Sequence, residues 1–263
     1  MVRLAAALAI MLAGAAAPVL AEAPRRVVSM NLCTDQLAML VAAPGQLASV
    51  SWLAVDPSVS LMSDEARGLP LNHGSAEEVF LHAPDLILAG TWSTGPAVEM
   101  LRQLGFRVET LPPANSIADI RDQIARMGAL LDQPDRAAAV LARFDADLAA
   151  ITPGPARLAA TYGANGMTAG PDSLSAEVMQ RAGLVPLSER LGLAGGHLAL
   201  EELVMAAPEM LVTGSRYDPP SRAESITDHP AFAAIPAERR SVPDRDWICG
   251  LPAIAGTAAR LAQ

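Results

Sequence analysis

The chain has 263 residues, with 28 Asp and Glu against 19 basic residues, a formal net charge of −9 and 51% apolar residues. Every basic residue is an Arg, and no basic cluster occurs, which argues against nucleic acid or an anionic membrane surface as a partner. The length suits one large domain or two smaller ones, and either arrangement can bury a full core.

Residues 1–21 have the pattern of a secretory signal peptide. Arg3 precedes an apolar run of small residues ending in Val-Leu-Ala, so we expect cleavage after Ala21. An uncleaved anchor is the alternative, but the run is short and interrupted by Gly and Pro. The absence of Cys at the cleavage point argues against a lipid anchor. We therefore expect an exported, soluble mature protein with a net charge near −10, because Arg3 is removed.

Residues 22–115 alternate between short apolar segments and amphipathic segments. The expected strands are 25–31, 47–52, 85–90 and 106–111, and the expected helices are 33–42 and 97–105. We take Thr34 as the N-cap of the first helix. Alternation of this kind predicts a parallel sheet with helices on its faces, and therefore an N-terminal α/β lobe.

Residues 116–152 break the alternation, because two amphipathic helices, 116–131 and 134–151, follow one another without a strand. Pro134 suits the first turn of the second helix. That helix can pack on the surface of one domain or bridge two lobes. We favour a single long, rigid bridging helix, because strands and helices alternate again over residues 153–263 and predict a C-terminal α/β lobe there.

The chain contains one internal repeat. HGSAEEVFLHAPDLILAGT begins at His73 and HLALEELVMAAPEMLVTGS begins at His197, with His, Glu-Glu, Ala-Pro and Gly at matching places. Ser75 and Glu78 have the spacing of a capping box, whereas the second copy has Ala at the capping place. His73 and His197 lie in loops before the helices. They are candidate contacts for a ligand or metal across a cleft, or a simple remnant of duplication.

Glu77 and Glu201 occupy the first turn of the repeated helix in the two copies. Acidic residues favour helix N-termini because of the helix macrodipole, and this preference alone explains a single Glu in the first turn of a helix. Two exposed carboxylates in matched contexts, one per lobe, favour a two-point docking surface instead.

Aromatic residues are scarce, at 3% of the chain, yet every Trp and Tyr follows an expected strand. Ligands of open parallel sheets bind at the carboxyl ends of strands. Packing in the core is the alternative for each ring. The residues expected at the binding cleft are Trp52, Trp92, Tyr162, Asn165, Arg216, Tyr217 and Trp247.

Cys33 and Cys249 are the only cysteines of the chain. An oxidising compartment permits a disulfide between them, and free buried Cys is also common. Both lie in predicted loops at the cleft edge, so contact of Cys33 with a ligand or metal stays open alongside the disulfide.

Several segments together resemble one family in their order and spacing. They are RVVSMNLCTDQLAMLV, APDLILAG, AGPDSLSAEVMQRAGL, EELVMAAPEMLVTG and DWICGLPAIAGTAARL. The whole mature chain resembles the periplasmic binding proteins of ABC importers for cobalamin, ferric siderophores and haem. The resemblance implies two Rossmann-like α/β lobes joined by one rigid helix, a ligand cleft between them, and a periplasmic monomer without intrinsic cofactor. It also implies that Glu77 and Glu201 pair with Arg residues of the inner-membrane permease.

The sequence leaves the chelate open. Arg216 favours an anionic ferric chelate or haem, because its guanidinium is a fork for carboxylates, whereas the Trp residues favour a corrinoid. A binder of bare Zn²⁺ or Mn²⁺ is one alternative, but it needs three or four converging ligands. An exported enzyme is the other, and we find no GxSxG, HExxH, P-loop or GxGxxG motif.

Overall fold

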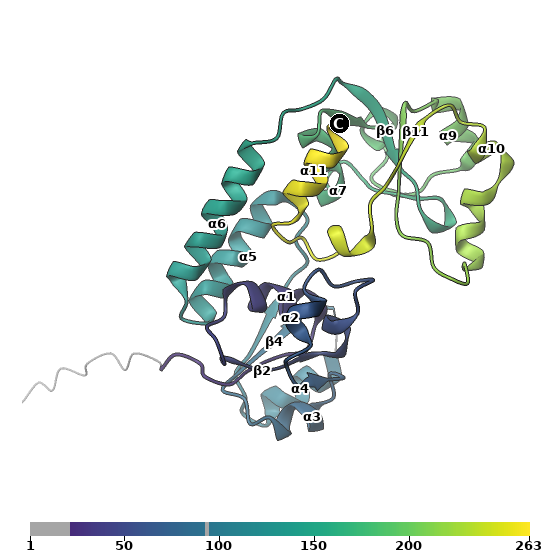
Figure 1. Ribbon diagram of the computed structural model, residues 1–263. Helices are drawn as coiled ribbons and strands as arrows, with labels where there is room; N and C mark the ends of the chain where they lie inside the picture. Colours follow the sequence, from purple (N-terminus) through teal and green to yellow (C-terminus); the bar gives the residue numbers. More distant parts are fainter. Residues whose placement is uncertain (1–21, 93–94) are drawn as a thin grey trace, which may run out of the picture.

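A computed structural model describes residues 22–92 and 95–263, which form two α/β lobes (Figure 1). The expected signal peptide, residues 1–21, lies outside this part of the chain. Among the described residues, no helix combines the length and apolar character needed to cross a membrane. The α/β architecture with parallel sheets agrees with the prediction.

The N-terminal lobe contains a parallel five-stranded sheet in the spatial order β3-β2-β1-β4-β5. The strands are β1 (Val27–Ser29), β2 (Leu47–Ser51), β3 (Leu71–Asn72), β4 (Leu86–Gly90) and β5 (Val108–Leu111). Its helices are α1 (Leu32–Val41), the 3₁₀ helix η1 (Trp52–Val55), α2 (Ser63–Ala66), α3 (Ala76–Leu81) and α4 (Gly95–Gln103). The strand order reverses between β1 and β4, which makes that point the topological switch at which open α/β sheets bind ligands.

The C-terminal lobe contains a parallel four-stranded sheet in the order β11-β10-β6-β8, with its switch point between β6 and β10. The strands of this lobe are β6 (Arg157–Thr161), β8 (Leu184–Pro186), β10 (Met210–Thr213), β11 (Glu238–Ser241) and the short antiparallel pair β7 (Met167–Thr168) and β9 (Gly196–His197). Its helices are η2 (Ala164–Gly166), α7 (Leu174–Arg181), α8 (Leu187–Leu191), α9 (Leu200–Ala206), η3 (Arg222–Asp228), α10 (Pro230–Ala233), η4 (Asp244–Asp246) and α11 (Ile254–Leu261).

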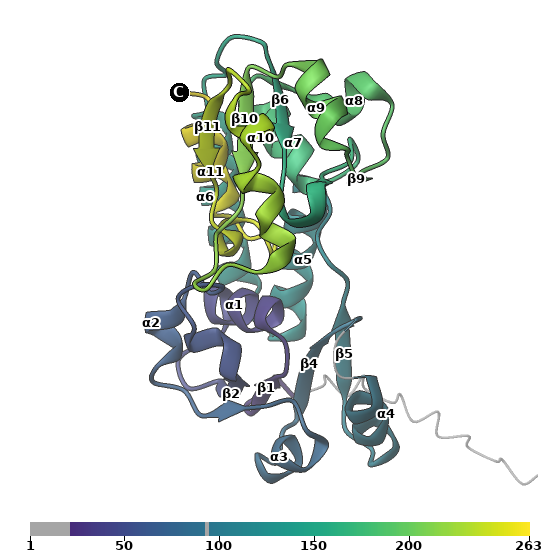
Figure 2. The same ribbon diagram turned by 90° about the vertical axis from the view of Figure 1, so that its right-hand side faces the viewer.

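Two helices lie side by side between the lobes, α5 (Ile117–Leu130) and α6 (Pro134–Ala149) (Figures 1 and 2). The amide of Ile117 donates to Glu177 of the C-terminal lobe at 2.7 Å, so α5 starts beside that lobe and returns to the N-terminal one. Near the start of α6, Arg136 Nε donates to the Val41 carbonyl of α1 at 2.8 Å. The crossing helix is therefore α6, of 16 residues, and α5 packs along it as a second strut.

One apolar cluster runs without interruption through both lobes. It contains residues of β1 and α1, the inner faces of α5 and α6, and residues of α7 and α11. Ile124, Met127 and Phe144 of the helix pair are fully buried within it. Because interiors of this kind are close-packed, the shared core holds the lobes in one relative orientation.

Candidate ligand-binding cleft

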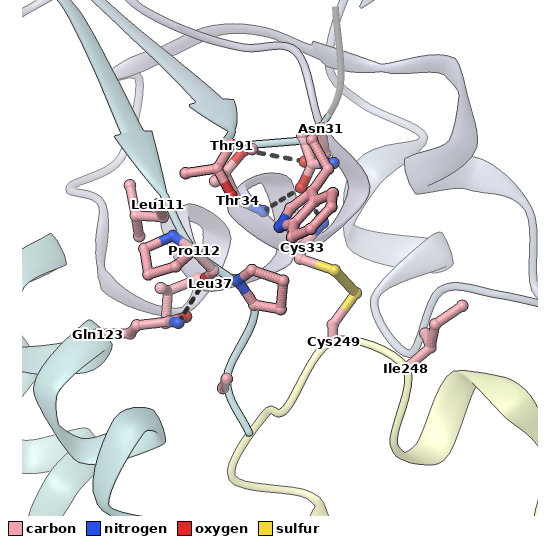
Figure 3. A pocket seen from close by; sticks show the side chains of 14 residues that line it. Asn31, Cys33, Thr34, Leu37, Thr91, Leu111, Pro112, Gln123, Ile248 and Cys249 are labelled. Carbon is pink, nitrogen blue, oxygen red and sulfur yellow. Dashed lines mark hydrogen bonds between the residues drawn. A yellow bond between two sulfur atoms is a disulfide. The ribbon is translucent and has the colours of Figure 1, made fainter. Parts of the chain in front are cut away.

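A pocket of about 380 Å³ lies where the lobes meet, and we call it the interlobe pocket (Figure 3). Its wall includes Asn31, two residues after β1, and Thr91, directly after β4, and these two strands flank the switch point of the N-terminal sheet. The C-terminal lobe contributes Ile248 and Cys249. The N-terminal lobe and α5 contribute Asn31, Cys33, Thr34, Leu37, Gly90, Thr91, Trp92, Leu111, Pro112, Pro113, Ala114 and Gln123.

The polar part of this pocket is built by the start of α1. Asn31 caps the helix, because its Oδ1 accepts from the amides of Cys33 at 3.0 Å and Thr34 at 3.4 Å. The helix therefore begins at Leu32, and the expectation that Thr34 is the N-cap is wrong. On the opposite wall, Gln123 Nε2 donates to the Pro112 carbonyl at 2.7 Å, which ties α5 to the segment after β5.

Trp92 is the aromatic residue of the interlobe pocket. Its side chain is 88% exposed although it belongs to the lining, so one ring face is free to contact a molecule in the pocket. An exposed ring on an apolar wall gives a large rigid contact area at low conformational cost. Trp92 therefore lines a pocket where the lobes meet, and its contact with a ligand stays a prediction.

Cys33 and Cys249 form a disulfide with their Cα atoms 4.9 Å apart. The bond joins α1 of the N-terminal lobe to the loop before α11 of the C-terminal lobe, and it forms part of the pocket floor (Figure 3). Cys33 as a metal contact is therefore wrong, because its sulfur is bonded to another sulfur and is no thiolate ligand.

A second hollow, of about 470 Å³, opens at the switch point of the C-terminal sheet, and we call it the Tyr217 pocket. Segments after β6 and β10 line it together with η3 and Asp244. The Tyr217 hydroxyl donates to Asp244 Oδ2 at 3.2 Å. The negative charge of Asp244 and this hydrogen bond raise the pKa of the Tyr217 phenol. Tyr217 is thus held as a neutral phenol.

Arg216 also lines the Tyr217 pocket, but its guanidinium fork is already occupied. Nη1 and Nη2 donate to the two carboxylate oxygens of Asp228 at 2.7 and 2.9 Å. This bidentate pair raises the pKa of Arg216 and lowers that of Asp228. The structure therefore does not present Arg216 as the open carboxylate fork that the sequence suggested.

Tyr162 is a core residue at the back of the cleft. It is 1% exposed, because its ring stacks on Phe232 at 5.5 Å between centroids and its hydroxyl donates to the Leu198 carbonyl at 3.3 Å. Desolvation raises the pKa of its phenol. Tyr162 thus packs in the core, the alternative that the sequence left open for each ring, although its edge reaches the Tyr217 pocket.

The remaining predicted residues are divided among separate places. Trp247 lines a small hollow beside Asp244, and Asn165 and His197 line an open hollow of about 600 Å³ with Glu201. Trp52 is 47% exposed and stacks on His73 at 6.3 Å. Among the described hollows, none includes both His73 and His197.

His73 is held by the acid that we expected in the capping box. Glu78 accepts from the His73 amide at 2.6 Å and lies 3.1 Å from its Nδ1, and the amide contact lowers the pKa of Glu78. Ser75 does cap α3, because its Oγ accepts from the Glu78 amide at 3.2 Å. Only half of the predicted capping box is therefore present.

The sequence analysis missed several polar residues of both pockets. Thr91 follows β4 directly, and Asn31 and Asp244 lie two and three residues after β1 and β11, so the same strand-end rule that selected the aromatic residues applies to them. Within residues 22–92 and 95–263, no group of three or more His, Cys, Asp or Glu is placed to hold a metal ion.

A profile of the periplasmic binding proteins matches residues 27–240 of this chain. The chain belongs to the periplasmic binding protein family. No curated protein sequence matches this family member, and its solved relatives are similar in fold at low identity.

Three solved structures illustrate that similarity. A possible iron-binding (periplasmic solute-binding) protein from Staphylococcus epidermidis has 18% identity and a TM-score of 0.75, covering 92% of this chain and 98% of its own. The haem-binding protein RhuT from Roseiflexus sp. has 17% identity and a TM-score of 0.71, covering 91% and 99%. The vitamin B12-binding protein BtuF of Vibrio cholerae has 16% identity and a TM-score of 0.64, covering 91% and 96%.

Proposed function

We propose that this binding protein captures a metal chelate between its lobes in the periplasm and delivers it to the permease of an ABC importer. The observation that carries the proposal is the position of the interlobe pocket, at the switch point of one sheet and closed by the other lobe. A mostly apolar pocket with an exposed Trp and a few polar groups suits a large, partly planar ligand. Solved relatives named for haem, vitamin B12 and ferric hydroxamate support this ligand class.

The ligand-binding residues follow from the two pockets. Trp92 supplies the stacking surface, and Asn31 and Gln123 supply polar contacts at the N-terminal lobe. Tyr217 and Ser215 supply polar contacts at the C-terminal lobe. The protein carries the chelate as cargo, and no intrinsic cofactor is part of the proposal.

A fluorescence titration tests this assignment. Mature protein is titrated with cyanocobalamin, haemin, ferrichrome, ferrioxamine B and Zn²⁺, with absorbance corrections for inner-filter effects. We expect saturable quenching by one chelate, and Trp92→Ala should weaken its binding by about 10- to 100-fold, as for a central aromatic anchor. Trp52→Ala is the matched control and should cost less, because Trp52 lies against His73 outside the pocket lining. A response to Zn²⁺ alone would favour a bare-metal binder instead.

Glu77 and Glu201 are the proposed permease contacts. Both are exposed in the first turns of α3 and α9, one on each lobe. A partner with paired Arg residues would meet both at once, and the two contacts would reinforce one another.

Charge reversal tests this docking role. Glu77→Arg with Glu201→Arg should abolish transport in whole cells and leave the chelate affinity of the purified protein unchanged. The matched control is Glu99→Arg with Glu189→Arg, because these acids are also exposed, one per lobe, and each accepts a hydrogen bond from a Gln side-chain amide. Loss of chelate affinity in the first pair would move these residues into the binding site and refute the docking role.

A further inference from the structure

The charge of the cleft follows from its lining. Among the described residues that line the interlobe pocket, none is an acid or a base, and its polar side chains are Asn31, Thr34, Thr91 and Gln123. The amide and hydroxyl groups of these residues can both donate and accept hydrogen bonds. This half of the cleft therefore offers no fixed charge to a ligand.

The two Arg residues that line the Tyr217 pocket already have partners within the protein. Arg216 forms the bidentate pair with Asp228. Arg239 lies over the Phe232 ring at 5.2 Å and donates to main-chain carbonyls, including Phe232 at 2.7 Å and Ala237 at 3.1 Å. A carboxylate or phenolate of a ligand would have to compete with these internal acceptors for the same two guanidinium groups.

Three carboxylates act on Tyr217. Asp244 accepts a hydrogen bond from the Tyr217 hydroxyl. The buried Glu224 accepts hydrogen bonds from the Tyr217 amide at 3.1 Å and from the Ser221 amide at 2.6 Å. Asp56 comes from the other lobe, and its charge contributes to raising the pKa of the Tyr217 phenol. Backbone contacts lower the pKa of Glu224, so it remains ionised at neutral pH. The pocket lining holds Arg216 and Arg239 as well as these acids, but the charges that act on the Tyr217 hydroxyl are those of the carboxylates, so the potential at that hydroxyl is negative.

The nearby Arg residues outside this lining either bond within the protein or line another hollow. Arg245 donates to the Pro57 carbonyl across the lobes at 2.9 Å and lies 3.8 Å from Asp246. Arg222 lines the separate hollow that contains Glu201. An anionic ligand in the cleft would thus meet carboxylates without a free counter-charge, a repulsive feature that excludes wrong ligands.

On these grounds we propose that the cleft selects uncharged or cationic metal chelates with hydrogen-bond donors on their periphery, and discriminates against anionic ones. Corrinoids with amide side chains and ferric trihydroxamates fit this class, whereas haem with free propionates and ferric tris-catecholates do not. The inference rests on the proposed function and adds the charge class of its ligand.

Pairs of closely related chelates with different charges test the inference by calorimetric titration. Cyanocobalamin is compared with its monocarboxylic acid, ferrioxamine B with its N-succinyl derivative, and haemin with its bis-amide. We expect the uncharged or cationic member of any pair that binds to be tighter by about tenfold, the effect of one partly screened charge at close range. The pair that binds identifies the ligand as a corrinoid, a ferric hydroxamate or a haem.

A variant that frees Arg216 provides the second arm. Asp228→Asn removes the carboxylate that occupies the Arg216 guanidinium. The ratio of the affinities for the uncharged or cationic chelate and its anionic counterpart should therefore fall towards one. Asp145→Asn is the control, because it releases Arg121 on the α5–α6 surface, paired at 2.8 Å, and changes the net charge equally. It should leave the preference intact.

The outcomes separate this inference from the function on which it rests. Tighter binding of the anionic member by the unaltered protein overturns the charge selection while the chelate-carrier function stands. An unchanged preference in Asp228→Asn overturns its explanation by the Arg216–Asp228 pair. Absence of binding by every chelate in both charge forms refutes the carrier function itself, and the inference with it.

Discussion

Removal of the Cys33–Cys249 disulfide should destabilise the protein strongly. The bond closes a loop with a sequence separation of 216 residues, which is most of the mature chain. In the chain-entropy treatment such a loop restricts the unfolded ensemble by about 5 kcal/mol at 25 °C. Residual structure in the unfolded chain reduces this figure, so Cys33→Ala with Cys249→Ala should lower the free energy of unfolding by about 2–5 kcal/mol.

Urea denaturation followed by circular dichroism measures this loss under oxidising conditions. The variant should also show a steeper dependence on urea, because an unlinked chain exposes more surface when it unfolds. Reduction of the unaltered protein with dithiothreitol is an independent control and should reproduce the stability of the double variant. Equal unfolding free energies of the oxidised protein and the variant would refute the reasoning, because they would show that the bond does not close this loop in solution.

Two other predictions concern the N- and C-terminal lobes. Burial raises the pKa of Asp35, which accepts from Ser51, to about 7 from an ordinary value of 3.8. The folded protein therefore retains this proton while the unfolded chain loses it, and stability should fall from about pH 4 to pH 7 by up to about 1.4 kcal/mol per pH unit. Asp35→Asn should flatten that dependence in denaturation curves at pH 4.5, 5.5 and 6.5, and an unchanged slope would contradict the assignment. Gly183→Ala should cost at least about 2 kcal/mol, because φ is +91° and the new Cβ would lie 2.4 Å from the Gly154 carbonyl oxygen. Gly45→Ala, at φ +78° in open space, is the control for backbone strain alone, and an equal cost would show that the close approach is unimportant.

The fold was predictable because its signals are local and repeated. Strands such as β4 and β10 appear in the sequence as short apolar runs after an Ala-Pro break, and the long helices as periodic segments without strands between them. The irregular segment between Arg216 and Asp228 has no such period, so the ion pair that neutralises Arg216 was not predictable. It depends on the path of η3 and not on a spacing rule.

The orientation of individual side chains was also beyond the sequence. Tyr162 and Trp92 both follow a strand, yet the Tyr162 ring turns inward to Phe232 while Trp92 remains exposed. The pairing of Cys33 with Cys249 depends on how the two lobes meet, which local patterns do not encode. The strand-end rule thus selected Trp92, Arg216 and Tyr217, which line the two pockets, but the orientation of each side chain depends on tertiary packing.

The position of the bound metal tests the central claim most directly. Crystals of the mature protein with its tightest chelate, measured at the absorption edge of the chelate's metal, would place the metal by anomalous scattering. The account predicts one strong peak between the interlobe pocket with Trp92 and the Tyr217 pocket, with the chelate in contact with both lobes. A peak on one lobe alone, or in the hollow that contains Glu201, would contradict it.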